Sequence, residues 1–85
     1  MTETPENRLK RLTMRSNRRG MKEMDLILGR FAASHLDNMS GEELDAYELL
    51  LNENDQDLYL WVTGKLDIPA EYLGLIAKIN AGFAA

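Results

Sequence analysis

The sequence of 85 residues predicts an all-α protein, a compact bundle of about five short helices. Apolar residues recur every three or four positions in several segments, which is the period of one face of an α-helix. Residues that cap helices stand before these segments. No stretch of useful length alternates apolar and polar residues, and no Asn-Gly or Asp-Gly hairpin turn occurs, so strands are not expected. We expect residues 1–85 to form a single helical domain, frayed over 1–4 and packed as a bundle over 5–83.

Capping and helix-breaking residues mark the first two helices. Thr4 is placed to cap a first helix that has Pro5 at its first position and ends near Arg15–Asn17. Polar residues and a glycine then interrupt the helical pattern, and a second helix is expected to begin near Gly20 or Met21. The apolar face expected for this second helix consists of Met24, Ile27, Leu28, Phe31 and His35.

The second half of the chain predicts three more helices. Ser40 and Glu43 have the spacing of a capping box, which begins the third helix. Asp55 is expected to cap a short fourth helix that Gly64 ends, and a fifth helix is expected to begin at Asp67–Pro69. The expected buried faces are Leu44, Tyr47, Leu50 and Leu51 in the third helix, Leu58, Trp61 and Val62 in the fourth, and Tyr72, Leu73, Ile76, Ile79 and Phe83 in the fifth.

The net charge of −4 is unevenly distributed along the chain. Residues 1–30 hold eight basic and four acidic side chains, a balance of +4, whereas residues 31–85 hold two basic and ten acidic ones, a balance of −8. A polarised protein of this kind can be oriented by charge on a partner, although ordinary solvated faces explain the same pattern. Charge alone leaves both interpretations open.

Composition excludes several classes of protein. Cysteine is absent, which excludes disulfides, thiolate zinc sites and cysteine catalysis and favours a reducing compartment. No apolar run approaches the about 20 residues that span a bilayer, and no secretory signal is present, so stable membrane insertion is not expected. We expect a cytoplasmic monomer, a bacterial-type chain without a targeting sequence.

Residues that carry chemistry are few. His35 is the only histidine and lies on the apolar side of the second predicted helix, where a partly buried structural role is expected. Asp55 and Asp57 share one turn, but the rest of a calcium-binding loop is missing from the sequence. Phosphate-binding loops and the nucleophile elbow of serine hydrolases are missing as well. We expect no catalytic residue, no metal site and no stably bound cofactor, and hence no enzyme.

One segment, residues 18–25 with the sequence RRGMKEMD, combines features of a docking surface. Two arginines can bind carboxylates, carbonyls or phosphates, and the helix that follows adds partial positive charge at its N-terminus. Gly20 allows a positive φ and the close approach of a partner. Glu23 follows Arg19 by four residues and is placed to hold that guanidinium. From the residues alone, an ordinary turn glycine and a routine first-turn acid are the slightly favoured explanation of Gly20 and Glu23.

Residues 19–23, RGMKE, resemble the R-G-x-x-E motif of the succinate dehydrogenase assembly factor family, the SdhE-type FAD assembly factors. The resemblance covers roughly residues 8–62. It includes Arg15, Arg18 and Phe31 around the motif, and a D-x-D-L-x-x-W pattern from Asp55 to Trp61. A bare R-G-x-x-E is a weak pattern, but its position in a chain of this length, with the second pattern downstream, makes the resemblance specific.

The resemblance implies a five-helix assembly chaperone. Members of the family bind the flavoprotein subunit of succinate dehydrogenase, or of fumarate reductase in some bacteria, and promote covalent attachment of FAD to a histidine of that subunit. The FAD and its chemistry would belong to the flavoprotein, and this chain would hold the partner's domains so that flavin and histidine align. The expected partner-binding residues are Arg15, Arg18, Arg19, Gly20, Met21 and Glu23.

A small nucleic-acid-binding helical module with a basic face is the alternative function. Arg8, Arg11 and Arg15 follow helical spacing and would form a basic stripe on the first helix. Against this alternative, the net charge is negative, the second half of the chain is acidic, and aromatic residues do not interleave with the stripe.

Overall fold

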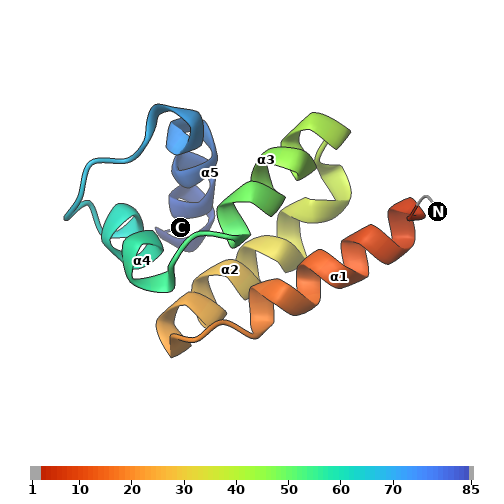
Figure 1. Ribbon diagram of the computed structural model, residues 1–85, viewed down its shortest axis with the longest axis horizontal. Coiled ribbons are helices and arrows are strands. Elements are labelled where there is room, and N and C mark those ends of the chain that lie inside the picture. The colour runs from red at the N-terminus through yellow and green to blue at the C-terminus, as the bar shows by residue number, and fades with distance from the viewer. Residues whose placement is uncertain (1–2, 85) are drawn as a thin grey trace.

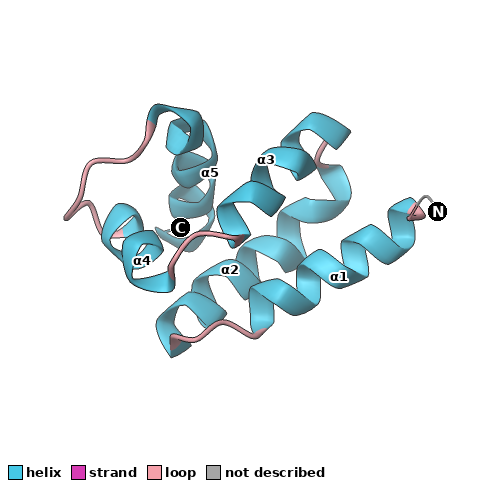
Figure 2. Cartoon of the chain, viewed as in Figure 1, coloured by secondary structure: helices cyan, strands magenta, loops and turns pink. Residues whose placement is uncertain are grey.

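The computed structural model describes residues 3–84, with side chains as far as residue 81, and its regular elements in this range are all helical (Figures 1 and 2). In chain order they are α1 (Pro5–Asn17), α2 (Lys22–His35), the 3₁₀ turn η1 (Leu36–Asn38), α3 (Gly41–Leu51), α4 (Asp55–Val62), the 3₁₀ turn η2 (Ala70–Tyr72) and α5 (Leu73–Ala84). The all-α prediction is therefore confirmed. The predicted fraying of residues 1–2 and the buried position of Phe83 lie outside the parts described.

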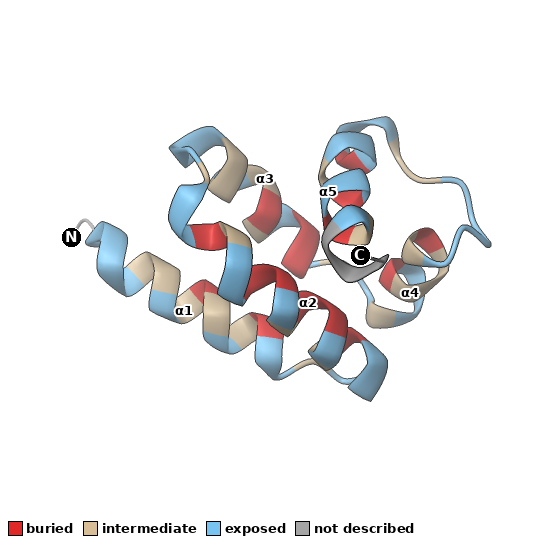
Figure 3. Cartoon of the chain, turned by 180° about the vertical axis from the view of Figure 1, so that it is seen from behind, coloured by how far each residue is buried: buried red, intermediate tan, exposed pale blue. Residues whose placement is uncertain are grey.

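Helix α2 lies at the centre of the molecule. It runs antiparallel beside α1, and it also contacts α4 and α5 (Figure 1). Figure 3 shows the buried residues gathered along α2 and the neighbouring parts of α3, α4 and α5. The Cα radius of gyration is 12.2 Å, which is close to the value of about 12 Å expected for a compact chain of this length.

The predicted helix starts are largely confirmed for the first three helices. The Thr4 side chain accepts a hydrogen bond from the backbone of Asn7, and Ser40 with Glu43 forms both bonds of a capping box. These bonds satisfy N–H groups that have no partner within a helix. Helix α2 begins at Lys22, slightly later than predicted, because the backbone N–H groups of Arg19 and Gly20 donate to the side chains of Asp25 and Asp55.

The last two helices begin differently from the prediction. The cap of α4 is Asn54, whose side chain accepts from the backbone of Gln56, so the prediction of Asp55 as the cap is wrong by one residue. Gly64 has a φ of +77°, which favours glycine, and it ends α4 as predicted. The residues after Pro69 first form η2, and α5 begins only at Leu73.

The core contains most of the predicted apolar faces. The buried apolar residues are Leu12, Met24, Ile27, Leu28, Phe31, Ala32, Leu36, Tyr47, Leu50, Leu51, Leu58, Trp61, Tyr72, Ile76 and Ile79. Leu73 was predicted among them but is 53% exposed, because the buried face starts at Tyr72 and Leu73 lies about 100° further round the helix. His35 is half-buried as predicted and stacks on Phe31 with a centroid distance of 4.6 Å.

One pair of polar side chains is fully buried between α1 and α3. The hydroxyl of Ser16 donates to the backbone oxygen of Leu12 at 2.8 Å and accepts from the Tyr47 hydroxyl at 2.6 Å. Burial raises the pKa of Tyr47 to about 12. Because each hydroxyl has a partner, the core tolerates both groups without the free-energy cost of an unpaired polar atom.

We therefore predict that Ser16→Ala lowers the free energy of unfolding by about 1–3 kcal/mol, since the Tyr47 hydroxyl then loses its acceptor in the core. Urea unfolding followed by circular dichroism measures the change. The double variant Ser16→Ala/Tyr47→Phe is expected to regain part of the loss, because it leaves no buried hydroxyl without a partner. Equal stability of Ser16→Ala and the wild-type chain would contradict the prediction.

Candidate partner-docking corner

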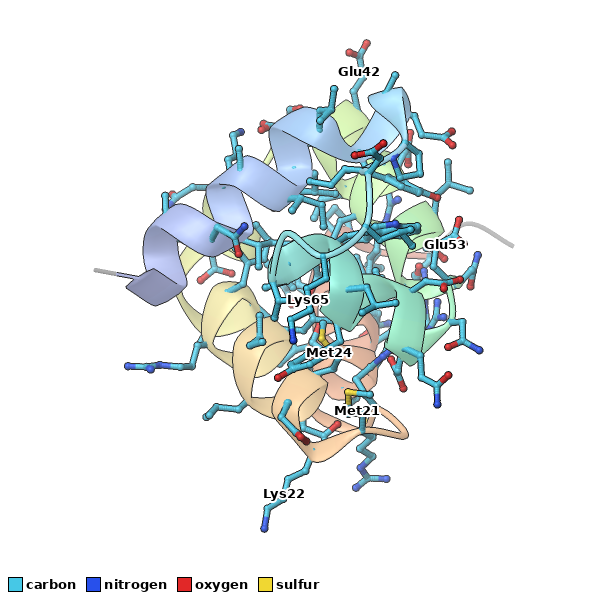
Figure 4. The ribbon with its side chains drawn as sticks, turned by 90° about the vertical axis from the view of Figure 1, so that its left-hand side faces the viewer. Met21, Lys22, Met24, Glu42, Glu53 and Lys65 are labelled. Atoms are coloured by element: carbon cyan, nitrogen blue, oxygen red, sulfur yellow. The ribbon has the colours of Figure 1, made fainter. Side chains whose placement is uncertain are left out.

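The segment singled out by the sequence lies where α1 turns into α2, and the turn between α3 and α4 lies beside it. We call residues 18–23 the arginine-glycine corner. Figure 4 views the end of the molecule that carries it: Met21 and Lys22 lie at one edge, and Glu42 of α3 projects from the opposite edge. The corner is therefore a local feature of one end of the bundle.

The side chain of Arg19 turns into the molecule and binds three acceptors. Its Nε donates to Oδ1 of Asp55 at 2.7 Å, and its two Nη atoms donate to the backbone oxygens of Leu51 at 2.7 Å and Glu53 at 3.1 Å. The side chain is only 9% exposed. Leu51 is the last residue of α3, where carbonyls lack partners within the helix. Arg19 therefore joins the corner to the end of α3 and the start of α4.

Asp55 binds the corner at a second point. Its Oδ2 accepts the backbone N–H of Gly20 at 2.6 Å, while its Oδ1 accepts from Arg19. The backbone N–H of Arg19 in turn donates to the carboxylate of Asp25 in α2. Two carboxylates from different helices thus hold consecutive peptide groups of the corner.

Gly20 is exposed, and its role differs from the one predicted. Within the described residues a positive φ occurs only at Gly64, so Gly20 does not use the left-handed freedom that the sequence suggested. Its special feature is close approach: a Cβ added to Gly20 would lie 3.2 Å from Oδ2 of Asp55. The absence of a side chain lets the Gly20 amide reach that carboxylate.

The other predicted site residues divide into exposed and half-buried ones. Arg18 and Glu23 are exposed, whereas Met21 is half-buried and packs against the core. Arg15 is half-buried and donates to the Leu51 backbone oxygen at 3.1 Å and to the Asn52 side chain at 2.8 Å. The structure thus brings all six predicted residues to one end of the molecule, but it turns two of the arginines inward.

Two expectations about individual carboxylates are corrected by these contacts. Glu23 does not hold the Arg19 guanidinium, because Asp55 occupies that place. Sequence reasoning assigned Asp55 to capping and gave it no part in the site. The D-x-D-L pattern that begins at Asp55 was the available signal, but its partner lies 36 residues earlier in the chain and no local spacing relates the two.

The turn that receives Arg19 is also tied to η2, just before the last helix. The Tyr72 hydroxyl donates to a side-chain oxygen of Glu53 at 2.8 Å, while the backbone oxygen of Glu53 accepts from Arg19. Burial, reinforced by this neighbouring carboxylate, raises the pKa of Tyr72 to about 12. The α3–α4 turn is therefore fixed from both sides, by the corner and by the residues that precede α5.

An apolar groove adjoins the corner. The groove, of about 430 Å³, runs between α2, α4 and α5, and Glu23 of the corner is one of its lining residues. Its lining consists of Glu23, Leu26, Ile27, Tyr59, Val62, Thr63 and Asn80. Leu26 is 56% exposed there.

Two of the three arginines of the basic stripe predicted on α1 are paired with acidic residues. Arg8 binds Asp45 at 2.6 Å and Glu48 at 3.2 Å, and Arg11 binds Glu48 and Glu3, each at 2.8 Å. A surface whose arginines already bind carboxylates has little positive charge left for phosphates. This pairing removes the main support for the nucleic-acid alternative.

The described residues offer neither a metal site nor a membrane span. No group of three or more histidine, cysteine, aspartate or glutamate side chains in them is arranged to hold a metal ion. None of the helices described is both long and apolar enough to cross a membrane.

Fold and corner together define a small helical protein with a preformed surface turn. The chain belongs to the family described as the flavinator of succinate dehydrogenase, whose model matches residues 10–82. The resemblance found in the sequence is thereby confirmed, and the assignment gives no support to the nucleic-acid alternative.

Curated relatives carry the name of an assembly factor. Succinate dehydrogenase assembly factor 2, mitochondrial, of Meyerozyma guilliermondii is 47% identical over 66 residues, which cover 78% of this chain and 49% of the relative. The protein of the same name from Candida glabrata is 49% identical over 63 residues, covering 74% of this chain and 41% of the relative. Succinate dehydrogenase assembly factor 2-A, mitochondrial, of Drosophila yakuba is 46% identical over 69 residues, covering 79% and 43%.

Two facts follow from these relatives. The chain spans less than half the length of each of them. Each is named a mitochondrial protein, which contradicts the expectation of a cytoplasmic chain of bacterial type. Absence of a targeting signal in these 85 residues was the basis of that expectation, and it was an insufficient one.

The contacts of α1 predict a dependence of stability on pH. Hydrogen bonds from Arg11 lower the pKa of both Glu3 and Glu48 below the ordinary value of 4.5. The contribution of these Arg11–carboxylate contacts to stability is therefore complete above pH 4.5 and is lost as pH falls through the lowered pKa values. Thermal melts at a series of pH values should show that the melting temperature falls less steeply over this acidic range for Glu48→Gln than for the wild-type chain. Parallel pH profiles for the two would contradict the prediction.

The contacts of the corner predict opposite results for its two adjacent arginines. Arg19→Ala removes the ion-pair partner of Asp55 and the donor to the Glu53 carbonyl, and it is expected to lower the free energy of unfolding by about 3 kcal/mol. Arg18→Ala removes an exposed side chain and should change the free energy of unfolding by less than about 0.5 kcal/mol. Denaturant unfolding compares the two variants, and similar losses for both would refute the inward role of Arg19.

Proposed function

We propose that this chain is a non-catalytic assembly factor that binds the flavoprotein subunit of succinate dehydrogenase and promotes the covalent attachment of FAD to it. One observation carries the proposal: the R-G-x-x-E residues of a chain that matches the flavinator family over residues 10–82 form a surface corner whose backbone is already held in place. The names of the curated relatives, assembly factors of succinate dehydrogenase, support the same function. They also support the mitochondrion as the compartment.

The corner is suited to docking because its parts have separate tasks. Arg19 maintains its shape from inside, while Gly20 leaves its backbone open to a partner and Arg18 and Glu23 present opposite charges to solvent. A partner can therefore meet a surface that needs little rearrangement, which lowers the entropic cost of binding. The neighbouring apolar groove offers additional area for contact.

A conformational role fits the residues better than a catalytic one. His35, the single histidine of the sequence, stacks on Phe31, and its Nδ1 lies 3.0 Å from the Ser34 hydroxyl. In the proposed function the FAD stays with the flavoprotein, and this chain holds no cofactor of its own. Its contribution is to favour an arrangement of the partner in which the reacting groups are close, and proximity alone accelerates reactions strongly.

We predict that Gly20→Arg abolishes covalent flavin on the flavoprotein subunit when the two proteins are co-expressed. The Cβ of the new side chain would press on the Asp55 carboxylate at 3.2 Å, and the side chain adds bulk where the partner would contact the backbone. Flavin fluorescence of the subunit after denaturing electrophoresis measures the attachment. The matched control is Gly74→Arg, which adds the same side chain at an exposed glycine of α5 that has open space around it. Undiminished fluorescence with Gly20→Arg would count against the proposed function.

A further inference from the structure

We propose that Asp55 is a positioning residue for docking: by accepting hydrogen bonds from Arg19 and Gly20 at once, it holds the arginine-glycine corner in the shape that a partner recognises. This inference rests on the proposed function, because it takes the corner to be the surface that meets the flavoprotein subunit. Asp55 lies outside the R-G-x-x-E motif, 35 residues after Gly20 in the chain.

The two oxygens of the Asp55 carboxylate have different donors. Oδ1 accepts from the side chain of Arg19 at 2.7 Å, and Oδ2 accepts from the backbone of Gly20 at 2.6 Å. The donors belong to consecutive residues, so one rigid carboxylate fixes the guanidinium and the next peptide group relative to each other. Hydrogen bonds to an ionised carboxylate are among the stronger ones in proteins.

The place of Asp55 in α4 explains why its carboxylate is available. Asn54 caps the helix with its own side chain, so Asp55 is not needed there. Asp55 is the first residue of α4, where the helix dipole favours a negative charge. Its side chain is 18% exposed, so water competes only weakly for the two donors.

Asp25 completes the arrangement from α2. Its carboxylate accepts the backbone N–H of Arg19, and Asp55 accepts the next one, that of Gly20. Two successive peptide groups are therefore held by side chains from two different helices. Arg18 and Glu23 are exposed on either side of these groups. Because the two hydrogen bonds hold the backbone between them, it is ordered before a partner arrives.

The same contact explains why position 20 is a glycine. A Cβ there would lie 3.2 Å from Oδ2 of Asp55, closer than ordinary van der Waals contact. Any side chain at this position would press on the carboxylate that the Gly20 amide binds. Gly20 and Asp55 act as one unit, although only Gly20 belongs to the motif.

The test compares Asp55→Asn with Asp57→Asn in the full chain. Asparagine keeps the shape of aspartate but has one acceptor oxygen, so its NH₂ group must face Arg19 Nε or the Gly20 N–H, both of which are donors. Asp57 is the matched control. It is exposed in the same first turn of α4 and makes no hydrogen bond or ion pair with the residues described, and its replacement changes the net charge equally.

Two quantities are measured: affinity for the purified flavoprotein subunit, at a temperature where circular dichroism shows both variants folded, and hydrogen exchange of the Gly20 amide by NMR. Loss of a charged hydrogen bond predicts that Asp55→Asn raises the Kd about tenfold or more and speeds exchange of the Gly20 amide about tenfold or more. Asp57→Asn is expected to remain within about twofold of the wild-type chain in both.

The outcomes separate this inference from the function on which it rests. Asp55→Asn binding as tightly as Asp57→Asn overturns the positioning role. An unprotected Gly20 amide in the wild-type chain also overturns it, and that measurement needs no variant to fold. A wild-type chain that does not bind the subunit overturns the proposed function, and the docking role of Asp55 with it, even where the Gly20 amide is protected.

Discussion

One buried guanidinium joins the two halves of this protein at the end that carries the motif. Arg19 reaches from the α1–α2 turn to the α3–α4 turn, pairs with Asp55 and binds carbonyls at the end of α3. Without it the Glu53 carbonyl would lose its donor, and Asp55 would be a shielded charge without a counter-ion, each of which costs free energy. The shape of the corner, the end of α3 and the start of α4 depend on this set of contacts.

Local signals predicted most of the fold. The starts of α1 and α3 depend on hydrogen bonds between residues a few positions apart, so the sequence alone identifies them. The prediction of the N-cap of α4 failed because two adjacent residues both suit that position. Asn54 and Asp55 are both good caps, and only the contact of Asp55 with Arg19 decides between them. Periodicity likewise does not say which of Tyr72 and Leu73 turns inward at the start of α5.

For the site, the sequence located the segment but not the directions of its side chains. Nothing in the local pattern distinguishes Arg18, which faces solvent, from Arg19, which faces inward. The acceptor of Arg19 lies 36 residues away, and such a contact depends on how α3 and α4 pack against α1 and α2. The resemblance to a family marked both Gly20 and Asp55 as parts of patterns, and only the structure shows that they are in contact.

The corner takes its shape from both halves of the chain, so its final form depends on the completion of folding. The α1–α2 hairpin contains the whole R-G-x-x-E sequence and Asp25, yet the Asp55 carboxylate and the carbonyls that bind Arg19 come from beyond α2. A nascent or half-folded chain therefore has the sequence of the motif but not its folded conformation. In the proposed function, a partner that recognises the folded shape of the corner discriminates against incompletely folded copies.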